Sequence, residues 1–60
     1  MNKYLLLVEK VSDADRAEVI MNFKGIEFKR HGMTMYDVWT DEIHRNELNK
    51  FEWMSCIRVA

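Results

Sequence analysis

The order of apolar and polar residues predicts four strands along the chain. Residues 3–11 carry an almost unbroken apolar run, which is typical of a strand buried on both faces. Apolar and polar residues then alternate in residues 26–31 and 33–40, and Gly32 between them predicts the turn of a β-hairpin. Residues 53–59 are again rich in apolar positions and predict a last strand.

Two helices are expected between these strands. The first is predicted over residues 14–24, with Ser12 as its N-cap and Gly25 as the residue that ends it. The second is predicted over residues 42–52, with an N-cap at Asp41 or at the threonine before it. The first helix has a narrow polar stripe, so we expect its broad apolar arc to pack against more than one neighbour. That arc consists of Ala14, Ala17, Val19, Ile20, Met21 and Phe23.

The resulting order, β-α-β-β-α-β, is the pattern of the small two-layer ferredoxin-like sandwich. Right-handed crossovers place the first and third strands in the centre of a four-stranded antiparallel sheet. Both helices then lie on one face and leave the other open. The chain has 60 residues and no proline, so we expect one compact α+β domain over residues 1–60. The main alternative keeps these elements but pairs the last strand with a second chain.

Successive side chains of a strand point to opposite faces. This alternation places apolar groups on both faces of the first, third and last strands. Two short helices cover only one face, so we expect another molecule to cover the other. Large apolar side chains are the usual anchors of such an interface, and charges fix its register. The predicted partner-binding residues are Met35, Tyr36 and Trp39 as anchors, with Asp37 and Arg58 as register charges.

The small size of the chain also favours a partner. A domain of this length buries only about 60% of its unfolded surface and is marginally stable, although 48% of its residues are hydrophobic. Such domains gain stability from disulfides, a metal or another chain. Cys56 is the only cysteine, which excludes a disulfide within the chain and predicts a small buried hydrophobic residue.

Metal-ligating patterns are missing as well. His31, His44 and Cys56 do not have the short spacing of a structural zinc site. Asp13 and Asp15 alternate as at the start of a calcium loop, but its glycine and closing glutamate do not follow. We therefore expect no metal and no cofactor. A second copy of the chain, in a homodimer, is the expected stabilising partner.

The sequence carries no catalytic signature. Ser55 has no neighbouring His–Asp pattern, and two glycines are too few for a phosphate-binding loop. Asp41 and His44 are three residues apart, and such an Asp–His pair could act as a general base. A helix N-cap at Asp41 explains the same spacing more simply. Asp37 within an apolar strand is interpreted as a charge that prevents misregistered pairing. We therefore expect a non-enzymatic interaction module that masks or remodels a larger protein.

Nucleic-acid binding is the alternative function. Lys24, Lys29, Arg30 and His31 form the most concentrated basic cluster, and aromatic residues nearby would stack on single-stranded bases. Against this, the net charge is −1 and the aromatic-rich RNA-recognition consensus is absent.

The chain is expected to be cytoplasmic. Its longest apolar run near the N-terminus, residues 4–8, is far shorter than the roughly 20 residues that span a bilayer. No secretory signal is visible. Because the chain starts at Met1 and is so short, we expect a complete small gene product, of the kind found in phages and mobile elements.

Overall fold

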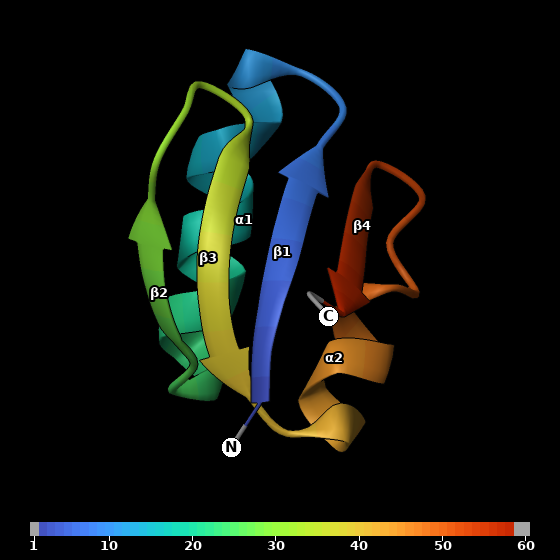
Figure 1. Cartoon of the computed structure of the whole chain (residues 1–60). Helices are drawn as coiled ribbons and strands as arrows, with labels where there is room; N and C mark the ends of the chain where they lie inside the picture. The colour runs from blue at the N-terminus through green and yellow to red at the C-terminus, as the bar shows by residue number, and fades with distance from the viewer. Residues whose placement is uncertain (1, 59–60) are drawn as a thin grey trace.

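The computed structural model describes residues 2–58, and Figure 1 shows a sheet with both helices on one side of it. The four strands are antiparallel and lie in the order β2-β3-β1-β4. This confirms the βαββαβ order and the two central strands that the sequence predicted. Val59, expected in the last strand, lies outside the described residues. The elements are β1 (Asn2–Val8), α1 (Val11–Lys24), β2 (Glu27–Arg30), β3 (Met35–Thr40), α2 (Glu42–Leu48) and β4 (Met54–Arg58).

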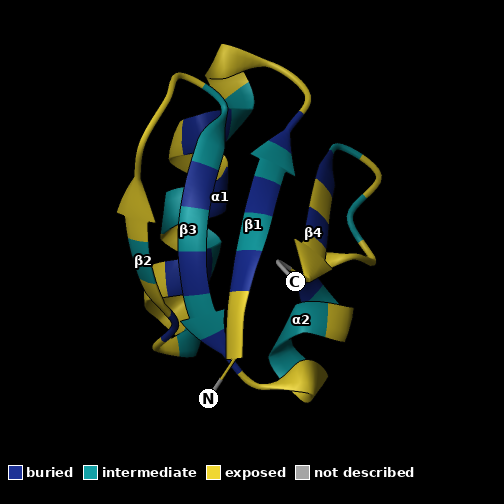
Figure 2. Ribbon diagram, in the orientation of Figure 1, coloured by how far each residue is buried: buried dark blue, intermediate teal, exposed yellow. Residues whose placement is uncertain are grey.

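The hydrophobic core lies between the sheet and the helices. Along β1, buried side chains alternate with half-buried ones, because successive side chains of a strand point to opposite faces. β3 follows the same alternation, as the bands in Figure 2 show. The described core consists of Tyr4, Leu6, Val8, Ala14, Ala17, Met21, Ile26, Tyr36, Val38, Leu48, Met54 and Cys56.

The start of α1 differs from the prediction. The helix begins at Val11, which was expected to continue the first strand, and Val11 is about half exposed. Lys10 is the N-cap, with extended backbone and no side-chain cap hydrogen bond. The predicted Ser12 cap is therefore wrong, because the chain turns into the helix before reaching Ser12. Gly25 ends the helix as expected, with a left-handed φ of 70°.

α1 packs against both β1 and β2, as predicted, but only a narrow part of its apolar arc is buried. Only Ala14, Ala17 and Met21 are buried on this helix. Val19 is 68% exposed and Phe23 is 91% exposed. The two alanines let the helix approach the sheet closely, and a flat sheet covers a single stripe of a helix. The outer part of the apolar arc therefore faces solvent.

α2 is shorter than predicted, because Asn49 ends it and turns its side chain to β4. The Asn49 Oδ1 accepts a hydrogen bond from the Cys56 N–H at 2.8 Å, and its Nδ2 donates to the Cys56 carbonyl at 2.9 Å. The Arg45 Nε donates to the same carbonyl at 3.1 Å. These bonds occupy outward-facing backbone groups of the edge strand β4. Cys56 is fully buried, as expected, and burial raises the pKa of its thiol to about 11.

Tyr36 connects the hairpin to α1. Its hydroxyl donates to the Glu18 Oε2 at 2.7 Å and lies 3.2 Å from the Ala14 carbonyl oxygen. Arg30 lies over the Tyr36 ring at 5.7 Å and pairs with the same Glu18 oxygen at 3.4 Å. Burial, followed by the hydrogen bond to Glu18, raises the pKa of Tyr36 to about 12.

We predict that Asn49→Ala lowers the free energy of unfolding by about 1–2 kcal/mol, because a buried backbone pair loses its side-chain partner. Urea denaturation followed by circular dichroism measures the change. Asn46→Ala is the matched control, since Asn46 contacts only an exposed Arg45 nitrogen among the described side-chain hydrogen bonds. Its effect is expected to stay below about 0.5 kcal/mol. Equal effects of the two substitutions would contradict the proposed role of Asn49.

We also predict that the stabilising effect of the Tyr36 hydroxyl is lost at alkaline pH. The folded pKa of about 12 exceeds the ordinary tyrosine pKa of 10.0, so the contribution is complete below about pH 10 and disappears between pH 10 and 12. The measurement is the difference in unfolding free energy between wild type and Tyr36→Phe across this range. A difference that stays constant up to pH 12 would refute it.

Candidate protein-interaction surface

The sheet side that faces away from the helices is the candidate surface, which we call the open face. Strand alternation and the pairing register define its residues. From β2 to β4 they are Glu27 and Lys29, then Met35, Asp37 and Trp39, then Lys3, Leu5 and Leu7, then Ser55 and Ile57.

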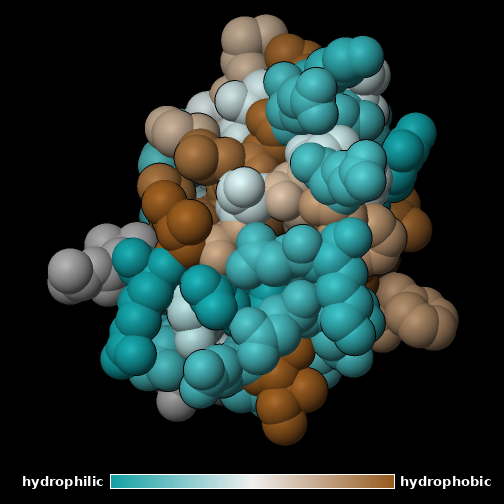
Figure 3. All heavy atoms as spheres, turned by 90° about the vertical axis from the view of Figure 1, so that its right-hand side faces the viewer, coloured by the Kyte–Doolittle hydropathy of each residue, from teal (hydrophilic) through white to brown (hydrophobic). Residues whose placement is uncertain are grey.

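One half of the open face is apolar. Leu5 is paired with Ile57 of β4, and Leu7 is paired with Met35 of β3. These four residues therefore adjoin one another, and we call them the apolar patch. Ile57 is 47% exposed, and the other three are half-buried. In Figure 3 the open face is seen edge-on at the left, where hydrophobic atoms gather beside a largely hydrophilic surface.

The other half of the open face carries charge. Asp37 is paired with Lys29 of β2, and its Oδ1 lies 3.4 Å from the His31 Nε2 and 3.9 Å from the Lys3 Nζ. The same Lys3 ammonium lies 5.8 Å from the Trp39 ring centroid. Asp37 thus lies beside the imidazole of His31 and between two strands that carry lysines, and Trp39 has a cation over its ring.

The structure supports only part of the predicted partner-binding set. Met35, Asp37 and Trp39 lie on the open face. Tyr36 does not, because it points to the helices and is fully buried. Arg58 is paired with Tyr4, a core residue, and so lies on the helix side of the sheet. Tyr36 is therefore wrong as an interface anchor, whereas Arg58 is exposed and its role stays a prediction.

Sequence reasoning missed three residues of the apolar patch: Leu5, Leu7 and Ile57. The alternation of side chains along β1 indicated two of them. It places Leu5 and Leu7 on the face opposite to the core residues Tyr4, Leu6 and Val8. These three residues are aliphatic, whereas the predicted anchors were chosen among aromatic residues and methionines.

The predicted basic cluster does not assemble. Lys24 lies at the end of α1 and pairs with Glu47 at 2.9 Å, a contact that also lowers the pKa of Glu47. Arg30 is engaged with Glu18 and with the carbonyls of the hairpin loop. Of the four residues, only the side chains of Lys29 and His31 lie near each other, both beside Asp37 of the open face. Figure 1 shows the C-terminal end of α1 and the tip of the hairpin at opposite ends of the molecule.

A hollow of about 410 Å³ lies beside the Asp41–His44 pair. Asp41 accepts a hydrogen bond from the His44 N–H at 2.8 Å, and its Oδ1 lies 3.0 Å from the His44 Nδ1. The backbone bond is the main reason for the lowered pKa of Asp41. The helix-cap interpretation is thus confirmed. The hollow is lined by Gly25, Glu27, Trp39, Thr40, Asp41 and His44.

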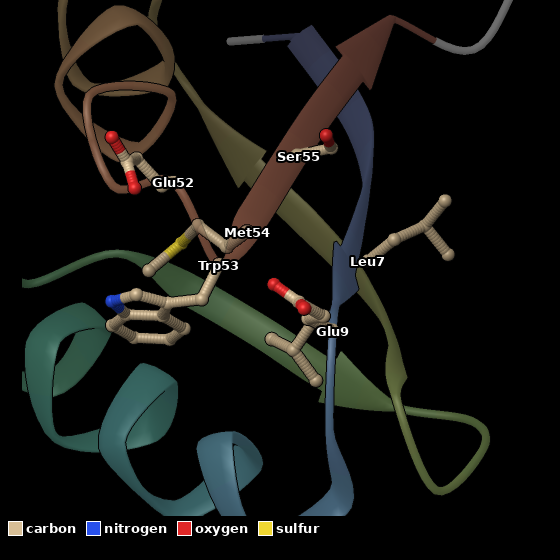
Figure 4. Close-up of a pocket in the computed structure, with 7 residues that line it drawn as sticks. Leu7, Glu9, Glu52, Trp53, Met54 and Ser55 are labelled. Atoms are coloured by element: carbon tan, nitrogen blue, oxygen red, sulfur yellow. The ribbon is translucent and has the colours of Figure 1, made fainter.

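A second hollow, of about 240 Å³, lies between the ends of β1 and β4. Figure 4 shows the Trp53 ring turned toward α1 and Leu7 pointing away on the other side of the sheet. Trp53 packs against Phe51 at 5.5 Å and has Arg16 over its ring at 5.2 Å. Trp53 thus extends the core. Within residues 2–58, no three His, Cys, Asp or Glu side chains are grouped in a way that would hold a metal ion.

Comparisons with protein-family models, curated proteins and solved structures found no match for the chain. None of the helices within residues 2–58 has the length and apolar character needed to cross a membrane.

Since the basic residues are dispersed or paired, we predict no salt-sensitive binding of single-stranded oligonucleotides. Fluorescence anisotropy of mixed-sequence DNA and RNA oligomers at low salt measures this. Binding that weakens as salt rises and disappears in Lys29→Ala would overturn the prediction and restore the nucleic-acid alternative.

Proposed function

We propose that this protein is a non-enzymatic interaction module that acts by burying the open face of its sheet against another protein. The observation that carries the proposal is the apolar patch of Leu5, Leu7, Met35 and Ile57, whose members adjoin one another across three strands. Exposed apolar side chains that are scattered singly are normal, whereas a contiguous patch marks an interaction site.

The contact is expected to use side chains of the face rather than strand addition at an edge. On β4, the N–H and C=O of Cys56 are already occupied by Asn49 and Arg45. The other edge strand, β2, has four residues, of which Glu27, Lys29 and Arg30 are charged. Short, charged edges are the usual protection against strand pairing. This argues against the alternative in which the last strand pairs with a second chain.

Asp37 gives the surface its specificity. It adjoins the apolar patch, because its pairing partner on β1 is Leu5. Covering the open face removes water from this carboxylate, which is unfavourable unless the charge stays paired. The Lys3 ammonium, at 3.9 Å, lies close enough to supply that pairing, and the His31 imidazole lies 3.4 Å from the same oxygen. A surface that brought a second carboxylate to this point would be rejected.

The chemistry of the site supports a non-enzymatic role. Asp41 is engaged as a helix cap for α2. Cys56 is buried, and its pKa of about 11 keeps it a protonated thiol at neutral pH. We place the module in the cytoplasm, where a single buried thiol stays reduced.

We predict that Leu7→Lys abolishes capture of a protein partner by the immobilised chain, because an ammonium on the apolar patch must lose its water on binding. The measurement is capture from an extract of the source organism, followed by the dissociation constant of the purified captured protein. Leu7→Lys is expected to raise that constant at least about tenfold.

Val19→Lys is the matched control, because it makes the same aliphatic-to-lysine change at a 68% exposed position on α1, away from the open face. This variant should bind as wild type does. Capture that survives Leu7→Lys, or that Val19→Lys removes equally, would show that the open face is not the binding surface.

A further inference from the structure

We propose that the hollow beside the Asp41–His44 pair binds an alkylammonium ion, the charged group that a free amine or a lysine side chain presents. The inference goes beyond the proposed function, because it assigns a ligand to a site outside the apolar patch. The hollow has a volume of about 410 Å³, which lies within the range of small-molecule sites and leaves room for an ammonium group with a short alkyl chain.

The ends of four elements form this hollow. Gly25 ends α1, and Glu27 begins β2. Trp39 and Thr40 end β3, and Asp41 is the N-cap of α2. Figure 1 shows these four ends gathered at one end of the molecule, near the start of β1. A Cβ placed on Gly25 would meet no atom within 4 Å, so no neighbouring group fills the space beside it.

The charges that line the hollow favour a positive ligand. Glu27 and Asp41 carry carboxylates, and neither lysine nor arginine lines the hollow. Within residues 2–58, Glu27 takes part in no ion pair. The Asp41 Oδ1 is engaged by the His44 N–H and Nδ1, but a carboxylate has about four acceptor sites and so keeps others for a ligand. The C-terminal end of α1, at Gly25, adds partial negative charge.

Trp39 supplies an aromatic wall beside these carboxylates. It is paired with Glu27 of β2, so the indole and the carboxylate adjoin on the same face of the sheet. An ammonium group is attracted both to the face of an indole ring and to a carboxylate. The combination therefore selects a cation with an apolar body over an anion or a neutral molecule.

Two lysines adjoin residues of the hollow without lining it. Lys3 is paired with Trp39 from the β1 side, and its Nζ lies 5.8 Å from the ring centroid and 3.9 Å from the Asp37 Oδ1. Lys24 precedes Gly25, but its Nζ bonds the Glu47 Oε1 at 2.9 Å. Since neither lysine lines the hollow, its carboxylates remain available to an ammonium group from outside.

Titration of the isotope-labelled chain with butylammonium chloride, followed by nuclear magnetic resonance, tests the proposal. The indole N–H signal of Trp39 and the amide signal of Gly25 should shift and saturate. The expected dissociation constant is on the order of 1–10 mM, because the site is open to water. Butanol has nearly the same shape without the charge and should cause no saturable shift. Sodium chloride at equal concentration controls for ionic strength, and the Trp53 indole signal should stay in place.

Substitutions of the lining residues identify the site. Glu27→Gln should raise the dissociation constant about two- to fivefold, because it removes an exposed carboxylate and keeps its shape. Asp41→Asn should have a similar effect and preserve the helix, because asparagine is an equally good N-cap. Trp39→Leu should weaken binding by a similar factor through loss of the ring. Glu52→Gln is the matched control, since it removes an exposed carboxylate beside the second hollow, at the other end of β1, and should bind as wild type does.

Circular dichroism shows whether each variant is folded, and if Trp39→Leu is not, the two carboxylate variants decide the result. A Trp39 signal that shows no saturable shift up to about 50 mM butylammonium would refute the site. Equal shifts with butanol, equal shifts of the two indole signals, or equal effects of Glu27→Gln and Glu52→Gln would refute it as well.

A second probe, acetyl-lysine methylamide, distinguishes the two sources of the ammonium group. A lower dissociation constant than that of butylammonium would identify the lysine side chain of a protein as the ligand, and a higher one would identify a free amine. The capture experiment with Leu7→Lys tests the proposed function separately, because Leu7 does not line this hollow. Failure of the ammonium site would leave that function standing.

Discussion

The hydroxyl of Tyr36 is the contact on which the two layers of this protein depend. It lies at the buried end of a hydrogen bond to Glu18, and Arg30 binds the same carboxylate while covering the Tyr36 ring. One junction thus joins α1, β2 and β3. A buried phenol without a partner is destabilising, so the pairing also fixes which side of β3 faces the helices. The opposite side of β3 is thereby assigned to the open face.

The register of the sheet extends this assignment to every strand. Pairing of Leu6 with Tyr36 and with Cys56 places three buried side chains in one row. A shift by one residue would exchange the buried row for the half-exposed one. The adjoining positions on the other side, Leu5 with Asp37 and Ile57, are consequently brought together as well. The apolar patch is therefore a direct result of the packing that buries Tyr36.

The fold could be predicted from the sequence because its strongest signals are local. The apolar run of β1, the hairpin around Gly32 and the end of α1 at Gly25 each depend on a few neighbouring residues. The Ser12 cap and the solvent-facing Phe23 depend instead on the angle at which α1 meets the sheet, which no local pattern contains. The candidate surface was predicted only in part, because an aromatic such as Tyr36 suits a core and an interface equally well.

The protection of the sheet edges decides which mode of contact we propose. A β4 edge with free backbone groups would be a template for pairing with a strand of another chain. Asn49 occupies the backbone of Cys56, which is why we propose contact through the side chains of the open face rather than through this edge. There, Asp37 lies next to the patch, and under the proposed function it disfavours any surface that would leave its charge unpaired. Asn49 thus both ends α2 and covers the outer backbone of β4 at Cys56.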